Sequence, residues 1–361
     1  MPSLPSKIAA GFLRLRRLVE LEDTRMPHRT IHRQQGSGEL RSRYLDAILS
    51  AVEESRRPAT RRVYKSAWTR FRSWAESEGL QSLPADPMTV AAYLINRAEQ
   101  GLSASTLSLD RKAISHFHRA EGLPTPTMSE GVKLTLAGLR NQAAEQGRGE
   151  PTQARGLTAE DLKSIVRTAR LRRSGESGRT ESRASARRRG NVDIAIAAVM
   201  RDALLRRSEA AELRWHDIEF SHDGSSLVTI RRSKTSNVSA VQYVGVEATA
   251  ALRRIRPLNA RSESRVFGLR SGRSISNRIA AMARAAGLGE GYRGHSPRVG
   301  MAQDLTAAGV GLAALMVAGR WRSERMPAHY ARGQSARRGA VAKLYREGSW
   351  REQAQGGRQA G

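Results

Sequence analysis

Apolar positions along the first half of the chain recur with the period of an α-helix. Five such segments lie between residues 39 and 145, and loop signals such as EGLQSLPADP and EGLPTPTMS separate them. The second segment, roughly Ala59 to Ser77, places four large apolar side chains on or near one face: Val63, Trp68, Phe71 and Trp74. The pattern predicts an all-helical domain over residues 38–141 with these aromatic side chains in its core.

The pattern changes in the second half, where we expect another domain over residues 157–347. LTAEDLKSIV opens it, with Thr158 as the N-cap of a helix and Asp161 three residues later. VDIAIAAVMRDALL is apolar enough for a buried helix. SLVTIRR and NVSAVQYVGV alternate like strands, and SKTS between them predicts a hairpin turn. Helical periodicity then resumes, so this domain is mainly α with one small sheet.

Three segments lack sustained apolar periodicity. We expect a flexible basic arm at residues 1–37, an interdomain linker at 142–156, where QAAEQGRGEPTQARG is rich in Gly, Gln and charge, and a flexible tail at 348–361. Residues 167–189 carry nine arginines among Ser and Gly. A disordered, solvated loop is the simpler interpretation of this run, with a specific nucleic-acid contact as the alternative.

The charge balance points to a polyanionic partner. The formal net charge is +28, with 55 arginines and 7 lysines against 34 acidic residues. Codon usage can explain arginine in place of lysine, but it does not explain the excess over acids. The chain has no cysteine, which excludes disulfides, thiolate metal sites and a cysteine nucleophile. Because no apolar run approaches the roughly 20 residues of a membrane span, we expect a soluble, cytoplasmic protein. Nucleic acid is the leading candidate for the polyanionic partner, and such a partner would make the protein nucleoid-associated.

The motif His-x-x-Arg occurs three times, which the abundance of arginine makes unremarkable for any single copy. The copies are His116 with Arg119, His295 with Arg298, and His329 with Arg332. The first lies inside a predicted helix, where a surface or capping role is the simpler interpretation. The second precedes a predicted helix that starts at Ser296 and Pro297, and a helix N-terminus with these two side chains is suited to binding an anion.

Other motifs surround this second copy in a recognisable order. Arg206 lies in LLRRSEAAELRW, Lys234 on the hairpin turn, and Trp321 in AGRW, nine residues before Tyr330. Together with HSPRVGMAQDL, this order resembles the tyrosine recombinase (phage integrase) family, and the resemblance covers both predicted domains. It implies a helical, SAM-like core-binding domain and an α+β catalytic domain that form a clamp around double-stranded DNA, and the activity of a site-specific DNA recombinase.

The resemblance also implies a role for each residue. Tyr330 is the nucleophile that leaves a 3′-phosphotyrosyl link, and Lys234 is the general acid. Arg206 and Arg298 clamp the phosphate, because a guanidinium can direct two N–H groups at its oxygens. His295 supplies a hydrogen bond or moves a proton, and Trp321 donates its indole N–H. Tryptophan stands where many relatives have histidine, and it is typical of one branch of the family. No cofactor or metal is implied.

Three further expectations come with this resemblance. Glu209, three residues after Arg206, would support the site, or else be an ordinary surface glutamate. A C-terminal helix would dock into a neighbouring subunit, or else pack on its own domain, through Ala340, Val341, Leu344 and Tyr345. A homotetramer would then join two DNA sites through a Holliday junction, with accessory DNA-bending proteins as further partners. The alternative functions are a catalytically silent DNA-binding factor and a type IB-like DNA relaxing enzyme.

Overall fold

The computed structural model describes residues 58–149, 153–175, 178–231 and 239–339, together with 341, 342 and 345. The chain divides into an N-terminal unit, Met1–Thr152, and a C-terminal unit, Gln153–Gly361. The expected arm at 1–37, the expected tail at 348–361 and Lys234 lie outside the described residues.

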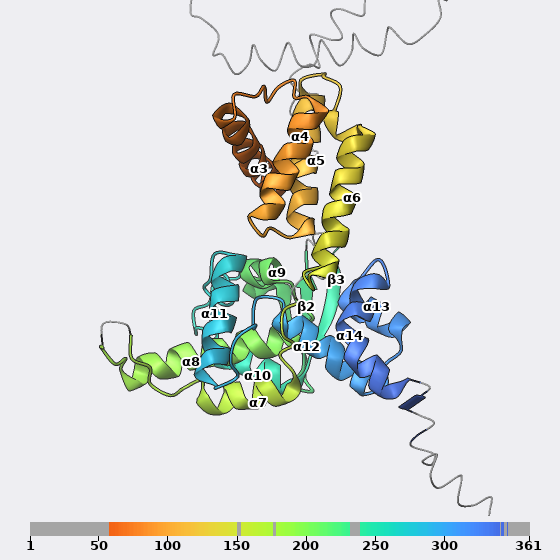
Figure 1. Cartoon of the computed structure of the whole chain (residues 1–361). Helices are drawn as coiled ribbons and strands as arrows, with labels where there is room; N and C mark the ends of the chain where they lie inside the picture. The colour runs from red at the N-terminus through yellow and green to blue at the C-terminus, as the bar shows by residue number, and fades with distance from the viewer. Residues whose placement is uncertain are drawn as a thin grey trace, which may run out of the picture. The chain divides into compact units, whose positions relative to one another are not determined.

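Helices make up the described part of the N-terminal unit (Figure 1). They are α3 (Pro58–Ser77), α4 (Pro87–Glu99), α5 (Ala104–Ala120), the 3-10 helix η1 (Pro126–Met128) and α6 (Glu130–Glu145). Phe71, Tyr93 and Leu94 are fully buried at the centre of its core, and Trp68 and Trp74 pack against this centre. The predicted aromatic core is therefore confirmed. Val63, which the pattern places on or near the same face, is 44% exposed and lies at the edge of this core.

The C-terminal unit combines helices with one small sheet (Figure 1). Its elements are α7 (Ala159–Thr168), α8 (Arg183–Asp202), α9 (Arg207–Glu212), the 3-10 helix η2 (Trp215–Asp217), β1 (Ile218–Phe220), β2 (Ser226–Ile230), β3 (Ala240–Val244), α10 (Val246–Ile255), α11 (Gly272–Ala285), α12 (Ser296–Ala307), α13 (Leu312–Gly319) and α14 (Arg325–Arg338). The sheet is antiparallel in the order β1-β2-β3. The predicted β2–β3 pairing is confirmed, and β1 adds a strand that the alternation pattern did not indicate.

Helix α8 forms the centre of the C-terminal unit. Its segment from Asp193 to Arg201 is buried, and α10, α11, α12 and α7 all pack against α8. The prediction of a buried helix here is confirmed. The helix ends at Asp202, so the next few residues, including Arg206, begin at the centre of the core.

The start of α7 follows the predicted capping pattern. The Thr158 hydroxyl accepts from the Asp161 backbone N–H at 3.3 Å, and the Asp161 carboxylate accepts from the Thr158 N–H at 2.9 Å. Each side chain thereby satisfies a backbone donor that the helix leaves unpaired. The helix boundary is therefore set by local chemistry that the sequence alone reveals.

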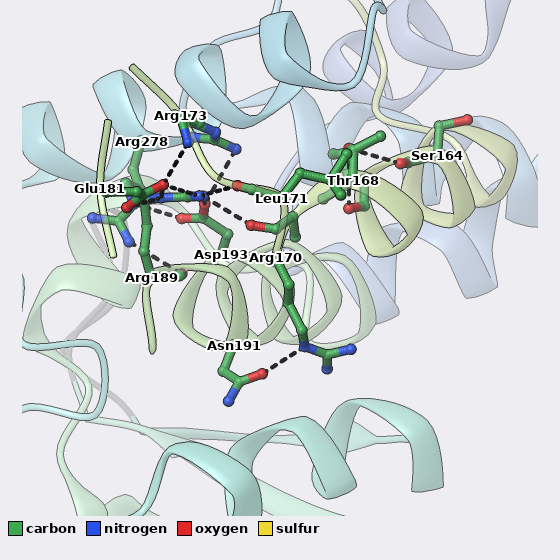
Figure 2. A network of polar contacts seen from close by, with 12 residues as sticks. Ser164, Thr168, Arg170, Leu171, Arg173, Glu181, Arg189, Asn191, Asp193 and Arg278 are labelled. Carbon is green, nitrogen blue, oxygen red and sulfur yellow. Dashed lines mark hydrogen bonds and ion pairs between the residues drawn. The ribbon is translucent and has the colours of Figure 1, made fainter. Parts of the chain in front are cut away.

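The arginine-rich run is not the disordered loop that its composition indicated. Residues 183–189 belong to the first turns of α8, and Ser174 and Thr180 form an isolated antiparallel bridge. Arg189 joins the two ends of the run: it pairs with Glu181 at 2.6 Å and donates to the carbonyls of Ala169 and Leu171 (Figure 2). Composition alone missed these bonds because it does not show how the run folds back to bring Arg189 next to Glu181 and the carbonyls of Ala169 and Leu171.

The network in Figure 2 has one fully buried carboxylate, that of Asp193. Arg189 lies 3.2 Å from it and Arg173 lies 3.6 Å from it, while the Arg278 Nε donates to its other oxygen. Arg278 belongs to α11, so Asp193 links α8 both to the arginine-rich run and to a helix distant in sequence. A buried anion that gathers three cations is difficult to replace, because its removal leaves like charges facing one another.

We expect Asp193→Asn to lower the free energy of unfolding of the C-terminal unit by about 2–4 kcal/mol, at the lower end for a buried pair because the arginines are partly exposed. Urea unfolding of the full chain measures the change. Glu160→Gln is the matched control: its pair with Lys163 has both side chains 71% exposed, so about 0.5 kcal/mol or less is expected. Equal midpoints for Asp193→Asn and Glu160→Gln would contradict the structural role of this network.

No helix in the described ranges is long and apolar enough to cross a membrane.

Candidate active site

The first part of the site lies between α8 and α9. Arg206 is the N-cap of α9, and its backbone N–H donates to the Glu209 carboxylate at 2.8 Å. The Arg206 guanidinium pairs with the other oxygen of the same carboxylate at 2.7 Å. The Glu209 side chain is only 3% exposed, so the alternative of a surface glutamate was wrong. Glu209 therefore fixes both the backbone and the side chain of Arg206.

The second part of the site is the N-terminus of α12. His295 is its N-cap and Pro297 occupies the first turn, as the sequence predicted. The helix lies against the chain that enters α7: a Cβ added to Gly300 would stand 1.8 Å from the Leu157 carbonyl oxygen. This close backbone approach requires glycine at residue 300, and it sets the position of Arg298 one half-turn earlier.

Arg298 is the largest fully buried side chain of the described residues, at 2% exposure. Its Nη1 donates to the Leu204 carbonyl and its Nη2 to the Gly319 carbonyl. The face of its guanidinium lies over the Trp321 ring, with Cζ 4.3 Å from the centroid. The end of α8, the end of α13 and the segment that follows α13 thus hold this cation in place. A guanidinium has five N–H groups, so donors remain for an anion.

Trp321 and Tyr330 form the third part, beside a small apolar cluster. Tyr330 is 7% exposed and packs with Val299, Ala302 and Leu315, and its ring centroid lies 5.9 Å from that of Trp321. A Cβ on Gly319 would stand 1.7 Å from an atom of the indole. The tryptophan therefore packs directly on the end of α13, where only glycine leaves room for it.

Arg320 is a site residue that the sequence analysis missed. Its Nη2 donates to Glu209 and to the Leu204 carbonyl, both at 3.0 Å. The guanidinium groups of Arg206, Arg298 and Arg320 thus share two acceptors, the Glu209 carboxylate and the Leu204 carbonyl. In a chain with 55 arginines, the only available signal was the position of Arg320 directly before Trp321, at the end of an apolar helix.

Burial shifts the pKa values of Arg298 and Tyr330 in opposite directions. Burial, followed by the charges of Arg206 and Arg320, lowers the pKa of Arg298 to about 9. Removal from water also raises the pKa of the Tyr330 phenol, although the positive charges of Arg298 and Arg206 act in the opposite direction. The phenol therefore stays protonated at neutral pH, while both arginines favour the form that has lost its proton.

The pKa of His295 is lowered, although part of its side chain is exposed. Desolvation by the surrounding protein is the largest cause, and the charges of Arg298, Arg207 and Arg206 add to it. The imidazole is therefore neutral at pH 7. Arg207, which precedes Ser208 in α9, is a second residue of this neighbourhood that the sequence analysis did not single out.

The structure brings together six of the seven site residues that the sequence analysis singled out: Arg206, Glu209, His295, Arg298, Trp321 and Tyr330. Lys234 lies outside the described residues, as do Ala340 and Leu344 of the expected docking stripe. The other two members of that stripe, Val341 and Tyr345, are 69% and 54% exposed.

Of the remaining copies of His-x-x-Arg, one lies in the N-terminal unit and the other lies beside Tyr330, with the His329 ring centroid 6.2 Å from that of Tyr330. His116 and Arg119 belong to α5 of the N-terminal unit. His329 and Arg332 lie in α14, where Arg332 Nη2 is 3.4 Å from His329 Nδ1 on the exposed side. Among the residues that the structure describes, no group of three or more His, Asp or Glu side chains is placed to hold a metal ion.

Two family models match the chain. The Phage integrase family model matches residues 157–337, and the model of the phage integrase N-terminal SAM-like domain matches residues 42–121. The curated relatives include recombinase cre of Escherichia phage P1, 26% identical over 308 residues, which cover 76% of this chain and 84% of the relative. An integrase/recombinase xerD homolog of Selenomonas ruminantium is 24% identical over 319 residues, with 81% and 87% covered.

Solved structures show the same fold at lower identity. A lambda integrase dimer bound to a core site matches with a TM-score of 0.51 and 19% identity, covering 80% of this chain and 94% of that one. The Tn1549 transposon integrase in complex with transposon right end DNA also reaches 0.51, at 14% identity, with 80% and 93% covered. The family match spans half of the chain and contains every site residue named above. The chain therefore belongs to the phage integrase family, the tyrosine-type site-specific DNA recombinases.

Proposed function

We propose that this recombinase cleaves and rejoins duplex DNA by transesterification, with Tyr330 as the nucleophile. One observation carries the proposal: a buried tyrosine packs on Trp321, whose ring carries the Arg298 guanidinium on its face. The charges of Arg298 and Arg206 both lower the pKa of the phenol, as expected for cations that lie near it. A phosphodiester placed there would meet an oxygen nucleophile and its charge clamp together.

The reaction balances without an external energy source. The Tyr330 Oη forms a bond to phosphorus, the bond from phosphorus to the 5′ oxygen breaks, and the product is a 3′-phosphotyrosyl link with a free 5′-hydroxyl. The phenol loses its proton and the departing 5′ oxygen gains one. Attack by a 5′-hydroxyl from another strand reverses these steps, so the phosphoester bond is kept throughout and can be passed to a new partner.

Arg206 and Arg298 stabilise the charge on the nonbridging oxygens. Each guanidinium is preorganised, Arg206 by Glu209 and Arg298 by two backbone carbonyls, so neither must be reoriented when charge develops. The lowered pKa of Arg298, about 9, reflects the cost of confining like charges in a desolvated site. The anionic phosphate offsets that cost when DNA binds, which favours the bound state.

Double-stranded DNA is the partner, and assembly on it is the finer part of this proposal. The net charge of +28 supports a polyanionic partner, and the related lambda and Tn1549 integrases are bound to DNA in their structures. We propose a homotetramer that joins two DNA sites through a Holliday junction, one strand pair at a time, with the option of accessory DNA-bending proteins. The exposed Val341 and Tyr345 near the C-terminus support docking into a neighbouring subunit.

Covalent trapping in cells tests the nucleophile and the target together. Wild-type protein should recover DNA ends enriched at one sequence after rapid denaturation, and Tyr330→Phe should recover none, because it lacks the attacking oxygen. Tyr345→Phe, which removes an exposed phenol, is the control and should trap like wild type. Scattered ends would instead indicate a relaxing enzyme. DNA binding without covalent DNA would indicate the catalytically silent factor.

Lys234 is tested by changing the leaving group. Lys234→Ala should slow single-turnover cleavage by about 100-fold or more, since a general acid contributes this much. A substrate with sulfur in place of the bridging 5′ oxygen should restore most of the rate, because a thiolate departs without being protonated. Tyr330→Phe should stay inactive on both substrates. Equal defects of Lys234→Ala on the oxygen and sulfur substrates would exclude lysine as the acid.

We expect the pKa of His295 in the free protein to lie below the ordinary histidine value of 6.5. Arg207→Ala should raise that pKa, because it removes one of the charges that disfavour the imidazolium, whereas the exposed Arg284→Ala should leave it unchanged. NMR titration of the histidine rings measures both. Since the site uses neutral imidazole, cleavage should decline as pH falls through the measured pKa. An unchanged pKa in Arg207→Ala would contradict this electrostatic account.

A further inference from the structure

Two residues at this site adopt an unusual backbone conformation. In the described ranges, the only residues other than glycine with positive φ are Leu204, at 44°, and Arg320, at 56°. Side chains with a Cβ avoid this left-handed region, and strained residues of this kind cluster at functional sites. The two strained residues are joined by a hydrogen bond, because the Arg320 guanidinium donates to the Leu204 carbonyl. Their coincidence at the candidate site suggests that the strain serves the site's geometry.

Arg320 stands where a helix normally ends on glycine. It is the left-handed cap of α13, and its backbone N–H reaches the Met316 and Val317 carbonyls. Glycine would occupy this position without strain. The neighbouring Gly319 does not serve that purpose, because its missing Cβ makes room for the Trp321 ring. Arginine is therefore present at residue 320 despite its backbone conformation, which points to a role for the side chain.

The side chain of Arg320 connects the two clamp arginines. Its Nη2 contacts one oxygen of Glu209, whose other oxygen holds Arg206. The same Nη2 contacts the Leu204 carbonyl, which also accepts from Arg298. Arg320 thus touches the acceptor that orients each of the other two guanidinium groups. None of the other arginines described contacts both acceptors.

The electrostatic environment of Arg320 is unfavourable. Burial is the largest cause that lowers its pKa; the charge of Arg206 adds to this, while Glu209 opposes it. Its Nε and Nη1 are buried and have no hydrogen-bond partner within the described part of the chain. A residue chosen only for stability would satisfy these donors or avoid burial. The position therefore has a cost in the free protein that packing alone does not explain.

We propose that Arg320 is a positioning residue: it fixes the Glu209 carboxylate and the Leu204 carbonyl, and through them it sets the spacing of Arg206 and Arg298. This inference rests on the proposed function of those two arginines as the phosphate clamp. Without Arg320, the Glu209 carboxylate keeps its bonds to Arg206 and the Leu204 carbonyl keeps its bond to Arg298, but no side chain joins the two acceptors. The two guanidinium groups then no longer share one fixed frame. Displacements on the order of 1 Å in such a frame slow catalysis by about 100-fold.

Arg320→Gly is the decisive variant, because glycine suits the backbone. The thermal midpoint of the full chain should not fall, and affinity for the DNA site recovered by trapping should stay near that of wild type. Single-turnover cleavage of that site should fall by about 10- to 100-fold. Arg322→Ala removes an exposed arginine two residues away and is the control for loss of one charge. Cleavage by Arg320→Gly at the rate of the control would overturn the proposal.

A double-mutant cycle separates positioning from a mere loss of positive charge. If Arg320 acts through Glu209, then Arg320→Gly should have little further effect on cleavage once Glu209→Gln is present. Fully multiplicative effects of the two substitutions would overturn the proposal. Arg320→Lys keeps the charge but lacks the planar fork, so it should recover only part of the rate. Full recovery with lysine would likewise overturn it, in favour of charge alone.

A measurement without DNA distinguishes this inference from the proposed function. Nε–Hε signals of Arg206 and Arg298 in the free full-length protein should show restricted guanidinium motion, which Arg320→Gly should release and Arg322→Ala should not. If wild-type protein formed no covalent complex, the proposed function would fail, yet these signals would still decide whether Arg320 holds the two arginines. Unchanged signals in Arg320→Gly would overturn the positioning role.

Discussion

The site depends on one buried carboxylate. Among the residues that the structure describes, Glu209 is the only acidic group that contacts the three central arginines, and its two oxygens accept from Arg206 and Arg320. Three cations confined away from water would repel one another strongly without it. Removing the Glu209 carboxylate alone would lower the stability of the folded protein, because the arginines would stay buried without a compensating charge. The position of Glu209, three residues after Arg206, therefore determines whether the other charges can gather at all.

Backbone carbonyls complete what Glu209 begins. Arg298 takes its orientation from the Leu204 and Gly319 carbonyls, so the ends of α8 and α13 are fixed relative to α12 by one side chain. Two glycines make this convergence possible. Gly300 lets α12 approach the chain before α7, and Gly319 lets Trp321 pack on α13. The cations are thus positioned by helix ends that lie far apart in the sequence, and Tyr330 on α14 packs against the same framework.

The sequence predicted those features that depend on local pattern or on motif order. The Thr158 and Asp161 caps, the β2–β3 pairing and the aromatic core around Phe71 follow from neighbours within a few residues or from simple periodicity. Arg206, Arg298 and Tyr330 were singled out from the order of motifs along the chain, and that order can be recognised without knowing how the chain packs. Periodicity places Val63 near the apolar face of α3, but it does not show how far that face is covered, and Val63 is 44% exposed.

Arg320 and the arginine-rich run could not be predicted, for a shared physical reason. Which arginine meets which carboxylate is decided by tertiary contacts over long sequence distances, such as that between Arg320 and Glu209 or between Arg278 and Asp193. Composition shows only that arginines are abundant. The left-handed backbone at Arg320 is equally invisible, because Gly319 is the residue that a sequence would assign to the helix end.

The two arginine clusters of the C-terminal unit show how a structural cluster differs from one suited to bind an anion. Around Asp193, three arginines face two carboxylates, and Arg189 directs its remaining donors to backbone carbonyls. Around Glu209, three arginines face one carboxylate. The first cluster is nearly balanced in charge. The second keeps an excess of about two positive charges, and an added phosphodiester, which carries one negative charge, would reduce the repulsion within it. In a chain with so many arginines, this surplus of charge, rather than the presence of arginine, distinguishes a cluster suited to bind an anion from a structural network.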